Sequence, residues 1–367
     1  MDVFQADIAG QTIRYKFIYP LTRLFFRGGL EPAEEDGPFV SVTSEDIERC
    51  RGKFPEGALN GQIEFKALIS RTSVALLSEG PACVFHAAAV SAEGRAWLLT
   101  APSGTGKSTQ VMNWLKNGDH SPEVICGDMP ALRLEEDGTV TVCPSPWNGK
   151  ENLRGAGAAK LGGIICLEKA DENTIRPLSP VGRIGRCITQ FVCSPEDGAQ
   201  ADNLARLADA MLSNYPVWLM RNRGDMQSTE LMLKTLFDGV GGSGTDCAEP
   251  EKTAGAKDAG RKEKTPDCRA MRAIDCVHLE SVCGMSVLLA DKSAAGMCPY
   301  VSIVNDTGAQ LWKFLSGPHT AEQCAEMLKD LYPSEDEAAL REGAEDFVSL
   351  MSEKGYLVPA GGDGGEA

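Results

Sequence analysis

A short glycine-rich segment, residues 101–109, carries the clearest chemical pattern of this sequence: Ala-Pro-Ser-Gly-Thr-Gly-Lys-Ser-Thr. Gly104 and Gly106 permit backbone angles that turn successive N–H groups inward, where they can hold phosphate oxygens. Lys107 supplies a positive charge for β- and γ-phosphates, and the hydroxyl of Ser108 can coordinate Mg²⁺. The pattern therefore predicts a site for the phosphates of a nucleoside triphosphate. Its other candidate contacts are Ser103, Thr105 and Thr109.

The first position of this loop departs from the usual pattern G-x-x-x-x-G-K-S/T, because Ala101 stands where glycine is usual. Alanine is one methyl group larger and still fits many loops of this kind. A glycine-rich turn that binds no ligand is the alternative. Residues 97–100 read as a strand before the loop and residues 108–115 as a helix after it, which is the context that the motif requires.

Two polar residues outside the loop could complete the site. A triphosphate with bound magnesium needs an acidic ligand, which usually ends a neighbouring strand. Asp128 follows the apolar run 124–126 and is our candidate, with an ordinary turn aspartate before Pro130 as the alternative. His86 lies just before the strand that leads into the loop, but a lone histidine is more often structural than catalytic.

Three stretches together resemble the kinase domain of the HPr kinase/phosphorylase type. They are residues 86–89 (His-Ala-Ala-Ala), the loop 101–109, and Gly127-Asp128 followed by residues 146–151 (Pro-Trp-Asn-Gly-Lys-Glu). The resemblance covers residues 83–178 well and implies the fold that these kinases share with ATP-dependent phosphoenolpyruvate carboxykinase. It also implies ATP and Mg²⁺ as cofactors, with the metal held by Ser108 and Asp128.

One departure from these kinases concerns the general base. They carry two adjacent aspartates where this chain has Gly127-Asp128, so the residue expected to remove the hydroxyl proton is missing. His86 could replace it, or proton removal could matter less, because a loose phosphoryl-transfer transition state depends mainly on positioning and charge. Lys150 and Arg154 could stabilise the transferred charge. The metal-binding and substrate-binding signatures of the carboxykinase are not found in the sequence, so a shared fold does not imply shared chemistry.

The C-terminal part carries a second pattern, Asn-Asp-Thr-Gly-Ala-Gln-Leu-Trp from Asn305, which resembles a helix of PqqD-like domains. Asn305 or Asp306 would cap this helix, and Thr320 with Gln323 would form a capping box for the next one. Three short strands within residues 273–304 would complete a small winged-helix module. The resemblance implies a domain that holds the leader segment of a ribosomally made peptide as an added strand.

The remaining patterns predict an α/β protein of several parts. Strand-like runs at residues 12–18, 39–42 and 62–68 indicate an antiparallel, β-rich region over residues 1–80. Alternating strands and helices indicate an α/β core over residues 81–238 that contains the phosphate loop. Its expected strands are 83–90, 95–100, 124–126, 161–167 and a hairpin of 131–134 with 139–142, and its expected helices are 204–212 and a last one, up to 237, opened by Ser228.

The segment 239–268 is almost free of large apolar residues and is expected to be a flexible linker. The PqqD-like domain then occupies residues 269–359, and residues 360–367 form a disordered tail.

Composition argues against several classes of function. The chain has 36 basic and 52 acidic residues and a net charge of −16, which disfavours nucleic-acid binding and anionic membranes. Thirteen cysteines without a C-x-x-C spacing, and only four histidines, give little support to a structural zinc or iron–sulfur site. The sequence shows neither a signal peptide nor a membrane span. A cytoplasmic protein without a nucleic-acid or membrane partner is expected.

The leading hypothesis is a kinase that uses ATP and Mg²⁺ to phosphorylate a Ser or Thr hydroxyl of a peptide or protein held by the C-terminal domain. The linker would raise the effective concentration of that peptide at the phosphate site. A non-catalytic nucleotide-binding adaptor is the first alternative. The departures at Ala101 and Gly127 favour the adaptor, whereas the intact Gly106-Lys107-Ser108 and Asp128 disfavour it. A small-molecule kinase or carboxykinase-like enzyme is a further alternative.

Overall fold

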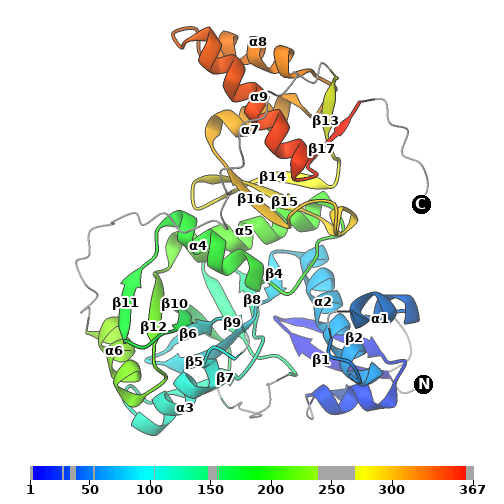
Figure 1. Cartoon of the computed structure of the whole chain (residues 1–367). Helices are drawn as coiled ribbons and strands as arrows, with labels where there is room; N and C mark the ends of the chain where they lie inside the picture. Colours follow the sequence, from blue (N-terminus) through cyan, green and yellow to red (C-terminus); the bar gives the residue numbers. More distant parts are fainter. Residues whose placement is uncertain are drawn as a thin grey trace. The chain divides into compact units, whose positions relative to one another are not determined.

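The computed structural model describes residues 3–26, 29–33, 39–52, 54–102, 104–147, 155, 157–238 and 269–360. The chain divides into two compact units, one of residues 1–242 with 282–284 and one of residues 243–281 with 285–367 (Figure 1). The expected α/β class is confirmed. The expected linker, residues 239–268, lies outside the described residues, as do residues 361–367 of the expected tail.

The first unit is built around a nine-stranded sheet that contains the strand before the glycine-rich loop. Its strands run in the order β4-β8-β9-β10-β6-β5-β7, with β12 beside β10 and β11 beside β12. Strand β10 is parallel to β6 and to β12, so these three strands end at the same edge of the sheet. The bounds are β4 Ala82–Val84, β5 Ala87–Ala92, β6 Arg95–Thr100, β7 Glu123–Cys126, β8 Ala131–Leu134, β9 Val140–Cys143, β10 Ala159–Lys169, β11 Thr174–Pro177 and β12 Val217–Asn222.

Strand β10 is the central strand, and residues 161–167 are buried without interruption, as expected for a parallel strand covered on both faces. Gly162 and Gly163 leave room there for two indole rings. A Cβ atom on Gly163 would lie 2.8 Å from the Trp218 ring and 3.1 Å from the Trp97 ring. The predicted strand at 161–167 and the predicted hairpin, which is the antiparallel pair β8 and β9, are both confirmed.

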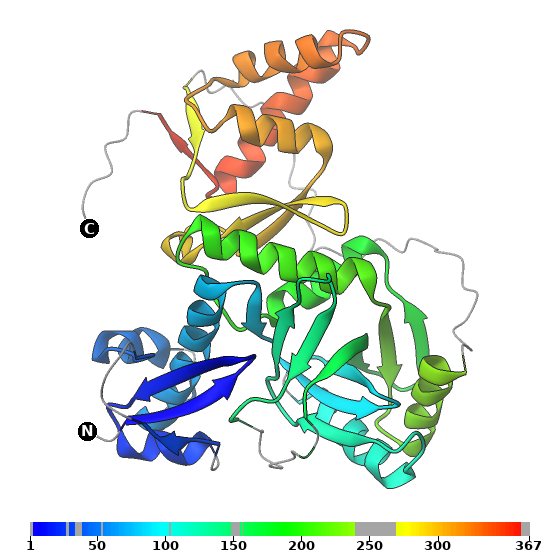
Figure 2. The same ribbon diagram turned by 180° about the vertical axis from the view of Figure 1, so that it is seen from behind.

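The helices that pack on strands of this sheet include α2 Asn60–Glu79, α3 Lys107–Asn117, α5 Gly198–Asn214 and α6 Met226–Phe237, and α4 Pro180–Cys187 packs against α5. Helix α5 contacts β4, β8 and β9, whereas α3 contacts β5 and α6 (Figures 1 and 2). The predicted helices at 108–115 and 204–212 are confirmed. The predicted start of α6 is wrong, because Asp225 is its cap and accepts a hydrogen bond from the Ser228 N–H at 2.8 Å.

A buried hydrogen-bond network fixes the helix that follows the loop. Gln110 of α3 is completely buried, and its amide donates to Ser228 Oγ at 2.6 Å and to Asn222 Oδ1 at 3.2 Å. The amide oxygen accepts from Thr229 Oγ1 at 2.8 Å. Because every partner lies on β12 or just inside α6, the network ties α3 to both elements and leaves no part of the Gln110 amide unbonded.

The N-terminal part of this unit is less rich in strands than its sequence indicates. It contains β1 Val3–Ile8, β2 Gln11–Lys16 and β3 Glu31–Pro32 in the order β2-β1-β3, a 3₁₀ helix Pro20–Phe26, and the helices α1 Ser44–Arg51 and α2 Asn60–Glu79. The run 12–18 is confirmed as β2, and the run 39–42 forms only an isolated bridge between Tyr15 and Val40.

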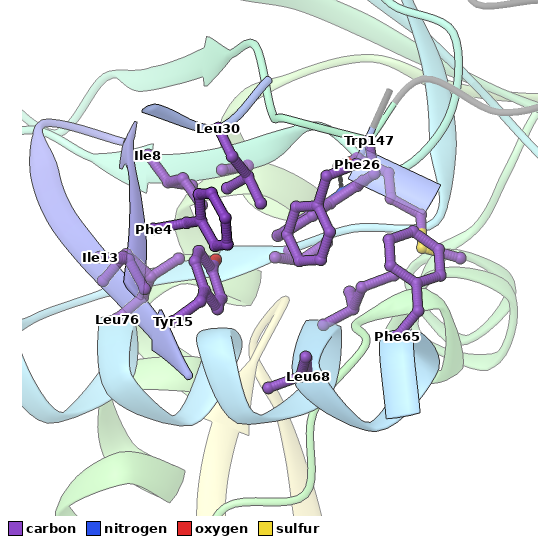
Figure 3. Packing of buried hydrophobic residues seen from close by; sticks show 14 of the residues in the cluster. Phe4, Ile8, Ile13, Tyr15, Phe26, Leu30, Phe65, Leu68, Leu76 and Trp147 are labelled. Atoms are coloured by element: carbon purple, nitrogen blue, oxygen red, sulfur yellow. Dashed lines mark hydrogen bonds between the residues drawn. The ribbon is translucent and has the colours of Figure 1, made fainter. Parts of the chain in front are cut away.

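The strand predicted at residues 62–68 is wrong, since these residues belong to α2. The short apolar run fits both structures, but the buried positions continue at helical spacing over the whole segment. Figure 3 shows Leu68 and Leu76 of α2 facing Tyr15 of the small sheet, with Phe26 and Trp147 beside them. The helix therefore buries one face against the strands. Its main buried positions are Phe65, Leu68, Ile69, Thr72 and Leu76.

Glu64 of α2 is completely buried and holds the 3₁₀ helix in place. Its carboxylate accepts from the Ile18 N–H at 2.6 Å, from the Tyr19 N–H at 3.0 Å and from the Thr22 hydroxyl. Three donors satisfy the buried charge, so removing the carboxylate leaves several groups without their acceptor.

We expect Glu64→Ala to lower the free energy of unfolding of the first unit by about 2–4 kcal/mol, because buried donors lose their charged acceptor. Urea denaturation of the full chain measures the change. Glu79→Ala, at the exposed end of the same helix, is the matched control and should change stability by less than about 0.5 kcal/mol. Equal denaturation midpoints for Glu64→Ala and the control would contradict the anchoring role.

The second unit has a three-stranded sheet of β14 Val277–Val282, β15 Met285–Ala290 and β16 Val301–Val304, in that order. The helices α7 Asp306–Phe314, α8 Ala321–Leu331 and α9 Glu337–Glu353 follow, and β13 Met271–Ala273 pairs with β17 Leu357–Pro359. The three expected strands are confirmed. Asn305 caps α7 by accepting from the Gly308 N–H at 2.8 Å, and Thr320 with Gln323 forms the expected capping box. Within the described part of the chain, no helix has both the length and the apolar character needed to span a bilayer.

Candidate active site

The glycine-rich loop joins the end of β6 to the first residue of α3, Lys107. Gly104 and Gly106 have positive φ angles of 82° and 104°, which other residues adopt only at a cost. A Cβ atom on either glycine would meet nothing within 4 Å, so the backbone conformation, not close packing, requires glycine. The Thr105 hydroxyl donates to the carbonyl of Pro102 at 2.7 Å and closes the turn. Ser103 lies outside the described residues.

The structure brings Lys107 and His86 together. The Lys107 ammonium donates to the carbonyl of Ala101 at 2.7 Å and lies 3.1 Å from Nε2 of His86. His86 immediately precedes β5, which is antiparallel to β6, and the Thr100 hydroxyl donates to its carbonyl at 2.8 Å. The expectation that His86 lies beside the loop follows from this hairpin.

Asp128 lies at the same place, with Oδ1 3.8 Å from Nε2 of His86. Its turn is fixed by side-chain hydrogen bonds to main-chain carbonyls: Cys126 Sγ donates to the Asp128 carbonyl at 2.8 Å, and Trp147 Nε1 donates to the Met129 carbonyl at 2.7 Å. Met129 has a positive φ of 59°, a conformation that a non-glycine residue keeps only where its surroundings hold it. The carboxylate is thus presented by a rigid turn.

Burial and neighbouring charges keep the His86 ring neutral. The pKa of His86 is lowered first by burial and then by the positive charge of Lys107, and Asp128 offsets part of this effect. The pKa of Lys107 is also lowered by burial, while Asp128 raises it. Since the His86 pKa falls below its ordinary value of about 6.5, the imidazole is neutral at pH 7 and can accept a proton.

Lys66 on α2 acts on the same groups and was missed by the sequence reasoning. Although the residue as a whole is exposed, burial lowers the pKa of its ammonium group, and the charge of Asp128 raises it. Lys66 in turn lowers the pKa values of His86 and Lys107. The available signal was a lysine between apolar residues of the run 62–68, which belongs to a helix but was interpreted as a strand.

The donor groups at the site suit magnesium. Ser108 lies in the first turn of α3, and its hydroxyl together with the Asp128 carboxylate offers the hard oxygen ligands that Mg²⁺ prefers. Within the described ranges, no cluster of three or more His, Cys, Asp or Glu side chains could hold a metal ion by itself. This donor set fits an ion that is held mainly through phosphates and only one or two protein oxygens.

Three predicted site residues are not placed. Lys150, Arg154 and Ser103 all lie outside the described residues, so their roles stay predictions. Thr109 is exposed in the first turn of α3.

A cavity of about 230 Å³ opens beside the loop, at the carboxyl ends of β6 and β10. Its walls include the last residue of β6, residues 101–102 of the loop, Cys166 of β10, and Arg186 and Gln190 from the end of α4 and the turn after it. Ligands of open α/β sheets commonly bind at this edge of parallel strands.

Comparison with known proteins supports the two resemblances unequally. Residues 299–357, from just before β16 to the first residue of β17, match the family model for coenzyme PQQ synthesis protein D (PqqD), which confirms the resemblance of the C-terminal part. The solved structure of the Hpr(Ser) kinase/phosphatase from Coxiella burnetii is similar to this chain at 15% identity and a TM-score of 0.26. That likeness covers 43% of this chain and 99% of the other, and no proposal below depends on it. No curated protein matches the chain.

Proposed function

We propose that this chain is an ATP- and Mg²⁺-dependent kinase that phosphorylates a Ser or Thr hydroxyl of a peptide. The observation that supports the proposal most is the contact of Lys107 with His86 at 3.1 Å, with the Asp128 carboxylate 3.8 Å from the same nitrogen. Phosphoryl transfer uses three such groups: a cation that binds phosphate, a neutral base that accepts the hydroxyl proton, and a carboxylate that binds magnesium.

Each group has a defined part in the proposed reaction. The loop N–H groups and Lys107 bind the β- and γ-phosphates. Ser108 and Asp128 would hold the Mg²⁺ ion, which would neutralise charge on the phosphates. The acceptor oxygen forms a bond to the γ-phosphorus while the bond to the bridging β–γ oxygen breaks. ADP is the leaving group. The hydroxyl proton passes to Nε2 of His86.

The second unit supports a peptide as the acceptor. Strands β14 and β16 are the edges of its three-stranded sheet, and an edge strand can pair with an extended peptide. The Ala290 N–H donates to the Tyr300 carbonyl. The main-chain N–H and C=O groups of residues 300, 302 and 304 therefore point toward β15, and those of the residues between them point away from it. The main-chain groups of Val301 and Ile303 therefore point outward and offer hydrogen bonds to an added strand.

We expect Ile303→Pro to weaken peptide binding at least tenfold, because proline removes the outward N–H group. Fluorescence anisotropy with a labelled peptide encoded beside the gene of this chain measures the affinity, and circular dichroism checks the fold. Ile303→Val keeps the N–H group and should bind as the unchanged chain does. A folded Ile303→Pro variant with unchanged affinity would place the peptide elsewhere.

The proposed activity is tested with the full chain, the same peptide, ATP and Mg²⁺. The expected result is a peptide that gains the mass of one phosphate, at a rate that depends on Lys107. An unchanged peptide mass, in a chain that binds Mg·ATP, would refute the kinase proposal.

A nucleotide-binding adaptor is the second candidate, and the departures at Ala101 and Gly127 favour it. An adaptor binds Mg·ATP without turnover, so ATP turnover that depends on Lys107 would eliminate it. A small-molecule kinase, by contrast, would keep its full activity when the chain is shortened to residues 1–238.

A further inference from the structure

Gln190 makes two contacts with His86, although the residues lie 104 positions apart in the sequence. The Gln190 carbonyl accepts from the His86 N–H at 2.8 Å, and its side-chain Oε1 lies 3.1 Å from Nδ1 of the ring. Nε2 of Gln190 lies 3.5 Å from Thr189 Oγ1. Because an amide oxygen only accepts hydrogen bonds, this contact places the ring hydrogen on Nδ1.

The turn that carries Gln190 is held firmly against the segment between β4 and β5 that carries His86. Phe191 forms a bridge with Phe85, and their rings pack edge to face with centroids 5.0 Å apart. The Val192 N–H donates to the Val84 carbonyl at 2.9 Å. These contacts on neighbouring residues fix the distance between the two side chains.

The other ring nitrogen requires the same tautomer. Nε2 of His86 lies 3.1 Å from the Lys107 ammonium, which can only donate, so Nε2 presents its lone pair. Two contacts from different elements, the turn after α4 and the start of α3, therefore agree on a neutral ring with hydrogen on Nδ1 and an electron pair on Nε2 that faces the Lys107 ammonium.

We propose that Gln190 is a positioning residue that holds His86 in the Nδ1–H tautomer, so that Nε2 is the nitrogen that accepts the acceptor's hydroxyl proton. The role as proton acceptor rests on the proposed function, whereas the tautomer does not. When Nε2 takes the proton, the imidazolium keeps its Nδ1–H bond to Gln190, and a charged donor makes that bond stronger. Phosphates that draw the Lys107 ammonium toward them free the Nε2 lone pair for this step.

The tautomer is measured by long-range ¹H–¹⁵N spectra of the full chain labelled with ¹⁵N-histidine, near pH 8, above the ordinary histidine pKa of about 6.5. The sequence has four histidines, so His86→Gln assigns the His86 signals. We expect a protonated Nδ1 and an unprotonated Nε2. Gln190→Met should shift both nitrogens toward a mixture of tautomers, and Gln190→Glu, which keeps an acceptor oxygen, should restore the Nδ1–H form.

Gln227→Met is the matched control, because Gln227 is exposed in the first turn of α6 and bonds Arg223. It should leave the His86 signals unchanged. A hydrogen on Nε2 of His86 in the unchanged chain, or a Gln190→Met spectrum that still shows a pure Nδ1–H form, would overturn the proposal.

Phosphorylation of the peptide gives the second readout. Gln190→Met should slow transfer about tenfold to a hundredfold, less than the 10²–10⁴ of a whole general base, with Mg·ATP affinity unchanged and partial recovery in Gln190→Glu. Equal transfer rates in Gln190→Met and the unchanged chain would overturn the catalytic part. If no chain transfers phosphate while the spectra behave as expected, the proposed function fails and the positioning of His86 by Gln190 stands.

Discussion

Lys107→Met reduces phosphoryl transfer to the peptide by about 10³-fold and weakens Mg·ATP binding about tenfold, if the loop is the phosphate site. The ammonium lies at the start of α3, 2.7 Å from the Ala101 carbonyl, and no other described cation is bonded within the loop itself. Methionine keeps the unbranched stem but has no charge. The loss is greater for transfer than for binding, because charge on the γ-phosphoryl group and the leaving oxygen develops in the transition state.

Calorimetric titration of Mg·ATP and the rate of peptide phosphorylation measure these two effects separately. Lys116→Met is the matched control, since Lys116 is exposed in the last turn of the same helix. It should leave both quantities close to those of the unchanged chain. The pKa of His86 should rise in Lys107→Met, because the positive charge that lowers it is gone. Nucleotide binding that survives Lys107→Met would show that the phosphates bind elsewhere.

The features that sequence predicts best depend on neighbours in the chain. The loop, the start of α3 and the caps of α7 and α8 are each set by a few consecutive residues, and all are found where expected. The β8–β9 hairpin is confirmed for the same reason, since a turn and its two flanking strands suffice to specify it. Local rules act here without help from distant contacts.

Two residues at the site depend on contacts that no local pattern records. Gln190 reaches His86 across 104 positions, through a turn whose place is set by the pairing of Phe85 with Phe191. Lys66 reaches the site from α2. Over the seven residues 62–68 the pattern fits a strand, and the helical pattern can be recognised only over all 20 residues of α2. The position of His86 could be predicted because one hairpin joins it to the loop.

Asp128→Asn is the variant for which we expect the second large effect, a loss of about 10²–10³-fold in transfer and a higher Mg²⁺ requirement. Asparagine keeps the shape of the side chain but replaces a charged oxygen ligand by a neutral one, which Mg²⁺ binds more weakly. The turn should persist, because bonds to its main-chain atoms hold it: Cys126 Sγ bonds the Asp128 carbonyl, and the Met129 N–H donates to the Ala87 carbonyl at 3.0 Å. A loss of activity would therefore report the carboxylate and not the fold.

The dependence of transfer on Mg²⁺ concentration separates a metal ligand from a residue that only adjusts its neighbours. Asp128 raises the pKa values of Lys107, Lys66 and His86, so Asp128→Asn lowers all three and makes His86 a weaker base. An electrostatic role alone would therefore slow transfer to the same extent at any Mg²⁺ concentration. A metal ligand makes it fail at neutral pH and recover as Mg²⁺ is raised, whereas Asp119→Asn, on an exposed turn, behaves as the unchanged chain does. Full activity of Asp128→Asn at low Mg²⁺ would show that Asp128 is not a metal ligand. Ser108 would then be the one candidate protein ligand among the described residues.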